Sequence, residues 1–143
     1  MRILGAVADL ADDVPGYKQL AEFWGTGFPS FHDSEIITLQ LNRTGVSHIS
    51  IRLVGRRREQ KEDGVERWVP LENTLVTFFL EGIDDLELFQ FSPQNVISAL
   101  TFEESETGFH LKIWPCYGLA GWLKVERVRI EFTPETKSSE FLK

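Results

Sequence analysis

The sequence WLKVERVRIEF, at residues 122–132, is the stretch that most strongly indicates the fold. Leu123 and Val125 alternate with charged or polar neighbours, which is typical of a strand that buries one face. The apolar positions then change parity, to Val128, Ile130 and Phe132. We expect one long strand that bends or bulges near Glu126-Arg127, and a long bent strand suits a curved sheet.

Two segments nearer the amino terminus predict a β-hairpin with one buried face. Apolar and polar residues alternate over residues 37–42 and again over 48–53, with a turn at Thr44-Gly45 between them. Residues 75–80 are apolar or threonine at every position, which indicates a central strand covered on both sides.

Further strands are expected at residues 86–91 and 109–113. The first changes parity, which predicts a bulge or twist near Leu88. The sequence therefore predicts a mainly β protein, α+β only by virtue of one short helix. Its six to seven mostly antiparallel strands would form a curved sheet, a sandwich or a half-open barrel.

Two helical segments are expected beside these strands. Tyr17, Leu20, Ala21 and Trp24 have helical spacing, and Gly25 is placed to end that helix. Ser92-Pro93 before the apolar residues 96–100 indicates an N-cap and one short helical turn.

The chain has no internal repeat and no Pro-rich or Ser-rich linker, so we expect a single domain over residues 1–143. Its expected parts are a helix and bend, a β-rich body and a frayed tail, at residues 1–30, 31–134 and 135–143.

The net charge of −7, from 15 basic and 22 acidic residues, is concentrated in the middle of the chain. Residues 68–111 contain eight acids and no lysine or arginine. Net acidity argues against broad nucleic-acid binding, which needs a basic patch. The most basic stretch, Arg56-Arg57-Arg58 with Lys61, has acids around it, and we interpret it as a solvated hairpin tip rather than a phosphate-binding patch.

The chain contains no stretch that predicts a membrane span or a secretion signal. Its longest nearly apolar run, residues 75–80, is far shorter than the about 20 residues that cross a bilayer. Acids at Asp9, Asp12 and Asp13 interrupt the apolar start of the chain. Cys116 is the only cysteine, which fits a reducing compartment, so we expect a cytoplasmic protein.

Catalytic chemistry has one compact candidate, His32-Asp33 with Glu35. These residues suit either a metal or acid–base cluster, or the capping of the loop that enters a strand. Cys116 and the serines lack a nucleophile-elbow pattern, and we expect Cys116 to be a buried small residue rather than a reactive thiol. Phosphate-binding glycine motifs are absent. The sequence favours a protein without catalysis, cofactor or metal; the alternatives are a small metal-dependent or hydrolytic enzyme at this cluster and a β-rich scaffold or oligomerisation module.

Recognition of another protein is the leading hypothesis from the residues themselves. Four tryptophans and eleven phenylalanines accompany the acidic segment, so aromatic anchors within a negative field could bind a basic partner. The residues expected to contact that partner are acids of the central region and two tryptophans: Glu81, Asp84, Asp85, Glu87, Glu103, Glu104, Trp114 and Trp122.

Several short motifs resemble, in their order and spacing, a bacterial protein family. They read FHDSEI at 31–36, EGIDDLEL at 81–88, FSPQNVI at 91–97 and YGLAG at 117–121, the last before a Val/Ile-rich strand. The family is the polymorphic-toxin immunity proteins known as immunity protein 50. Its members often have Asn-His before the Gln-Asn pair, where this chain has Ser92-Pro93.

The resemblance implies a small cytosolic protein that binds and neutralises a cognate toxin, and it implies no catalytic residues and no cofactor. An acidic inhibitor suits a basic toxin, such as a nuclease domain, better than most alternatives. The expected partner is therefore a protein, with neither nucleic acid nor membrane, and a homodimer is a further alternative.

Overall fold

The computed structural model describes residues 2–3, 14–25, 27–53, 56–60, 64–70 and 74–134, and the statements below concern these residues. The fold is mainly β, with one short helix, α1 (Tyr17–Trp24). The strands are β1 (Arg2–Ile3), β2 (Glu35–Gln40), β3 (Val46–Leu53), β4 (Arg56–Gln60), β5 (Glu66–Pro70), β6 (Thr74–Phe89), β7 (Val96–Ser105), β8 (Gly108–Tyr117) and β9 (Ala120–Pro134).

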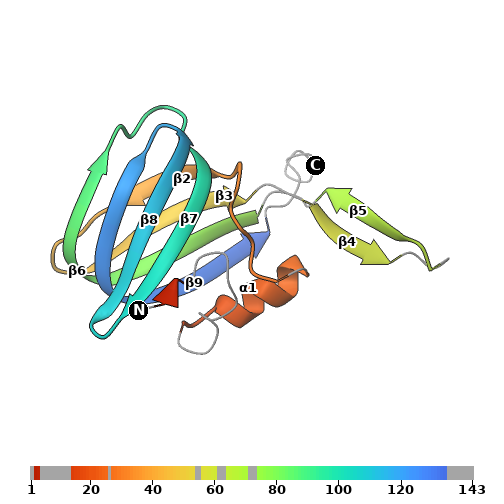
Figure 1. The fold of residues 1–143 in the computed structure, drawn as a ribbon, viewed down its shortest axis with the longest axis horizontal. Helices are drawn as coiled ribbons and strands as arrows, with labels where there is room; N and C mark the ends of the chain where they lie inside the picture. Colours follow the sequence, from red (N-terminus) through yellow and green to blue (C-terminus); the bar gives the residue numbers. More distant parts are fainter. Residues whose placement is uncertain are drawn as a thin grey trace, which may run out of the picture.

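Six of these strands form a curved antiparallel sheet that returns to its first strand (Figure 1). The order is β7-β2-β3-β6-β9-β8, and β8 pairs again with β7. The β2–β7 contact consists of the single pair Glu35 and Val96, while the short β1 joins β7 near its other end. This ring-like sheet confirms the predicted curved, mainly β architecture.

The long strand β9 bends where its sequence pattern changes parity. Leu123 and Val125 are buried, Glu126 and Arg127 are both exposed, and burial resumes at Val128. The first half of β9 lies between β6 and β8, whereas the second half pairs with β6 and receives no partner from β8. The predicted bend near Glu126-Arg127 is therefore confirmed, and it marks the point where β9 loses its second neighbour.

The partner strand β6 is a single strand of 16 residues and carries the matching irregularity. Its register against β9 shifts between Ile83 and Asp85, next to Gly82, which has a φ of 70°. The sequence predicted this irregularity near Leu88, several residues C-terminal to its observed position. Gly82 permits the distortion because glycine adopts this positive φ without strain, and a Cβ there would also lie 2.7 Å from the Glu126 side chain.

Helix α1 includes the four predicted apolar positions and ends at the predicted Gly25. Gly25, with a φ of 92°, ends it and donates its N–H to the carbonyl of Ala21. Tyr17 and Leu20 are buried, and the Phe23 ring lies 5.1 Å from that of Phe132 on β9. The helix therefore covers part of the second half of β9, where β8 is no longer a neighbour.

The predicted helical turn over residues 96–100 is wrong, because these residues begin strand β7. The Asn95 side chain accepts hydrogen bonds from the N–H groups of Ser92 and Leu119 and donates to the Ser92 carbonyl. These bonds close the 92–95 loop, and the chain leaves it extended. Ile97 and Leu100 are then buried, so burial in the sheet outweighs the local helix-start signal.

Strands β4 and β5 form a separate two-stranded hairpin that projects from the ring (Figure 1). This confirms that Arg56-Arg57-Arg58 belongs to a hairpin, although the exposure of its side chains lies outside what the structure describes. None of the described helices has the length and apolar character needed to span a membrane.

Candidate protein-binding face

The outward side chains of four adjacent strands, β7, β8, β9 and β6, form the surface that we call the outer face. Buried Leu111, Ile113 and Leu123 point inward, so the residues between them point outward. The pairing places these outward residues in three rows. The first two rows, from β7 to β6, are Glu103-His110-Lys124-Asp85 and Thr101-Lys112-Trp122-Glu87. The third consists of the pairs Ala99-Trp114 and Ala120-Phe89, just beyond the last pair of β8 with β9.

The outer face contains a groove of about 470 Å³, which we call the aromatic groove. Phe89, Trp114 and Trp122 supply its aromatic lining. The exposed fractions of Phe89 and Trp114 are 51% and 53%. Gly121 also lines the groove, and a Cβ at this position would lie 1.9 Å from the carbonyl oxygen of Glu87. The absence of a side chain at Gly121 therefore allows β9 and β6 to approach each other here.

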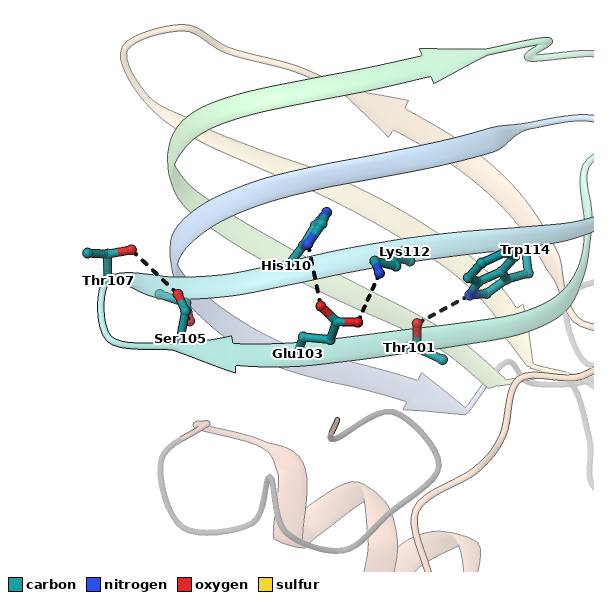
Figure 2. A network of polar contacts seen from close by, with 8 residues as sticks. Thr101, Glu103, Ser105, Thr107, His110, Lys112 and Trp114 are labelled. Carbon is teal, nitrogen blue, oxygen red and sulfur yellow. Dashed lines mark hydrogen bonds and ion pairs between the residues drawn. The ribbon is translucent and has the colours of Figure 1, made fainter. Parts of the chain in front are cut away.

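A polar network on β7 and β8 supports the groove (Figure 2). The indole Nε1 of Trp114 donates a hydrogen bond to Thr101 Oγ1, 3.3 Å away. Lys112 donates to Glu103 over 2.9 Å, and His110 Nδ1 lies 3.6 Å from the other carboxylate oxygen of Glu103. The hydrogen bond from Lys112 is the main reason that the pKa of Glu103 is lowered. Glu103 is therefore a fixed, compensated charge.

His110 links this network to the aromatic groove. Its ring meets the Trp122 ring edge-on, with 5.2 Å between the ring centroids. Burial is the main reason that the pKa of His110 is lowered, and Lys112 adds to the effect. The Nε2 atom is buried without a hydrogen-bond partner among the described residues. His110 is therefore neutral at neutral pH and acts as a packing partner for Trp122.

These two shifts predict that acid destabilises the fold in two steps. The pKa of His110 is lower in the folded state, so the unfolded state binds more protons and stability falls as the pH drops below about 6.5. The pKa of Glu103 is also lower in the folded state, so its contribution is lost as the pH falls from about 4.3 through the folded-state pKa. Denaturant unfolding between pH 7 and pH 3 measures both steps.

Single substitutions should separate the two steps. His110→Gln is expected to flatten the decline that begins near pH 6.5 and to leave the step at lower pH, while Glu103→Gln does the reverse. Unchanged pH profiles for both variants would contradict the assigned charge states.

The structure brings together three of the eight predicted contact residues around the groove, Glu87, Trp114 and Trp122. Asp84 and Asp85 lie on the same strand as Glu87 and are exposed. Within the described residues, these three carboxylates form no ion pair.

The other predicted acids occupy different environments. Glu103 is held by Lys112, and Glu104, its neighbour on the strand, points to the opposite face. Glu81 lies before the irregularity in β6 and pairs with Arg127 over 3.2 Å. Lysines and arginines of β8 and β9 thus lie beside the acidic segment, so its acids on β6 and β7 do not share one continuous negative surface.

The residues of the site that sequence analysis did not assign to it include Phe89, His110, Lys112 and Gly121. Phe89 had a usable signal, because it lies outside the apolar parity of Leu86 and Leu88 and so had to point outward. Lys112 and His110 became visible only with the register of β8 against β7 and β9.

The candidate catalytic cluster consists of two exposed loop residues, His32 and Asp33, and of Glu35, which begins strand β2. The side chains of His32 and Asp33 are 59% and 65% exposed and lie 3.5 Å apart, and His32 Nδ1 lies 2.9 Å from the Ser98 carbonyl. In the part of the chain that the structure describes, no group of three or more His, Cys, Asp or Glu side chains is placed to bind a metal ion.

The prediction that Cys116 is buried is wrong, since its side chain is exposed. Val96 pairs with Tyr117 and Ile97 with Pro115, so Cys116 is an extra residue at an irregularity in β8. Cys116 also shares the outward parity of Lys112 and Trp114, and all residues of β8 after Ile113 are exposed.

Comparison with curated proteins and with solved structures gave no match. A family model, described as immunity protein 50, matches residues 17–134. That range extends from the start of α1 to the end of β9 and includes the whole outer face. The family implies an immunity role in toxin systems, with a toxin protein as the partner. The chain belongs to the immunity protein 50 family.

Proposed function

We propose that this protein protects its producing cell by binding a cognate toxin domain in the cytoplasm through the aromatic groove. The observation that supports this most is the grouping of Phe89, Trp114 and Trp122 beside carboxylates that form no ion pair with described residues. A contiguous exposed apolar patch with a polar rim is typical of a protein interaction site. No catalytic role for the chain is part of this proposal.

The groove is suited to tight binding because its two tryptophans are already held in place. Trp114 is anchored by Thr101, and Trp122 packs against His110. Rigid aromatic residues lose little conformational entropy on binding, and tryptophans are enriched among the residues that dominate interface energies. We therefore assign the main binding energy to the two tryptophans.

The charge around the groove favours a basic partner. Glu87 lines the groove, and Asp84 and Asp85 precede it on β6. Such carboxylates attract a positively charged protein and increase its association rate. A toxin that cleaves nucleic acid is commonly basic, because it must bind phosphates, so a nuclease domain fits this surface.

Co-expression with the toxin domain encoded by the adjacent reading frame tests the proposed function. Cells that produce the toxin should survive when this protein is present, and the purified pair should form a complex with a Kd of the order of nanomolar. A catalytically inactive toxin allows the complex to be measured by calorimetry. No rescue and no complex with any neighbouring toxin would contradict the proposal.

Charge reversal at Glu87 tests the electrostatic part of the proposal. Glu87→Lys is expected to slow association about tenfold at low salt, and added salt should reduce the difference. Glu106→Lys makes the same change in net charge at an exposed turn away from the groove and serves as the matched control. Equal association rates for the two variants would show that the groove carboxylate does not attract the partner.

A further inference from the structure

The second half of β6 has one strand neighbour where the first half has two. Pairing between β3 and β6 ends at Val46 and Glu81, whereas β6 continues to pair with β9 as far as Phe89. On its other edge, residues 83–89 pair with no strand that the structure describes. Figure 1 shows this part of β6 rising at the side of the ring, next to β9. An unpaired edge offers backbone groups to another strand.

One hydrogen bond identifies which backbone groups point to this edge. The N–H of Leu86 donates to Asp85 Oδ1, 2.9 Å away, so it is directed away from β9. In an antiparallel strand, successive residues direct their N–H and C=O groups to opposite edges. Leu86 and Leu88 therefore direct theirs to the open edge, while Glu87 directs its groups to β9. The Asp85 carboxylate occupies a position that the carbonyl of an added strand would take.

The side chains along this edge define the complementary sequence. Asp85 and Glu87 lie on the outer face, and neither forms an ion pair with a described residue. Leu86 and Leu88 lie on the other face, and Leu88 packs against the core. An added strand would place alternate side chains beside these two sets. Basic residues would face the carboxylates, and apolar residues would face the leucines.

A second copy of this chain does not satisfy that pattern. Two copies paired through residues 83–89 would bring Asp85 and Glu87 of both chains onto one face. Like charges across a pair of strands destabilise it. The charge of this edge therefore selects a partner with a basic strand.

We propose that residues 83–89 of β6 receive an extended, alternately basic and apolar segment of the toxin as an additional strand. The inference rests on the proposed function and specifies how the partner binds. Main-chain hydrogen bonds to Leu86 and Leu88 supply affinity, and the alternating side chains supply specificity. The aromatic groove lies on the β9 side of β6, away from the open edge. One partner can therefore contact both the groove and the edge.

Amide hydrogen exchange, measured by NMR on this chain alone and with the inactive toxin domain of the adjacent reading frame, tests the inference without any variant. The amides of Leu86 and Leu88 should exchange at least roughly tenfold more slowly in the complex, because the Leu86 N–H exchanges its exposed bond to Asp85 for a main-chain bond to the added strand and the Leu88 N–H gains such a bond. A complex in which these two amides are unprotected would overturn the added strand and leave the proposed function standing. Absence of any complex would overturn both.

Two substitutions at Leu86 distinguish the contribution of its backbone N–H to binding from that of its side chain. Leu86→Pro removes the edge-directed N–H but no hydrogen bond to β9, and should weaken binding at least roughly tenfold. Leu86→Ala keeps the N–H and is expected to bind several times more tightly than the proline variant. Equal affinities of the two variants, with the fold intact by circular dichroism, would count against the added strand.

Discussion

Trp114→Ala is expected to weaken binding of the toxin domain about thirtyfold, which corresponds to about 2 kcal/mol. Trp114 is 53% exposed at the aromatic groove, and its indole is already oriented by Thr101. Its loss removes apolar contact area that the partner would cover, and it leaves the groove open at β8. Calorimetric titration of the inactive toxin measures the change.

Tyr117→Ala is the matched control for Trp114→Ala. Tyr117 lies on the same strand and is 60% exposed, yet it does not line the groove. Its removal should change affinity by less than about threefold, since most exposed interface neighbours contribute little. Equal losses in the two variants would mean that the groove is not the centre of the interface.

Asn95→Ala is expected to lower the free energy of unfolding by about 2–4 kcal/mol, the sum of a few lost bonds. Asn95 is buried and joins two segments: its side-chain oxygen accepts from Ser92 and Leu119, and its amide donates to Ser92. Alanine would leave the Leu119 N–H buried without an acceptor. The shift in the urea midpoint, at constant m-value, measures this effect.

Two neighbouring variants control for this effect. Gln94→Ala changes an exposed side chain in the same loop and should alter stability by less than about 0.5 kcal/mol. Asn95→Asp keeps the acceptor for Leu119 but places a carboxylate against the Ser92 carbonyl, so its loss should be intermediate. A stable Asn95→Ala protein would contradict the role assigned to this side chain in closing the loop.

The parts of the fold that could be predicted from sequence are those in which burial alone sets the pattern. Helix α1 and the bend in β9 follow from the spacing of apolar residues, because each segment buries one face. Strand β7 was misjudged, because Ser92-Pro93 is a helix-start signal whereas the conformation is set by Asn95 bonding to Leu119, 24 residues away. A contact between residues so far apart in sequence cannot be recognised from the residues near Asn95.

Three residues of the candidate site could be predicted from sequence: Trp114, Trp122 and Glu87. Trp114 and Trp122 were expected at a binding surface, and the register of β8 against β9 places both at the groove. Whether the acids form a uniform negative field could not be assessed from sequence. Lys112 and Lys124 come from strands later in the chain than most of the acids, so the sequence does not show that they lie beside them. Only strand pairing shows that Lys112 compensates Glu103.

Cross-saturation NMR on the complex tests the central claim, that the outer face binds the toxin, most directly. Saturation of the unlabelled toxin should attenuate the indole N–H signals of Trp114 and Trp122, because both line the groove. The indole of Trp24, on α1 and packed against the core, should keep its intensity. Unattenuated Trp114 and Trp122 signals in a fully formed complex would contradict the account and place the interface elsewhere on the protein.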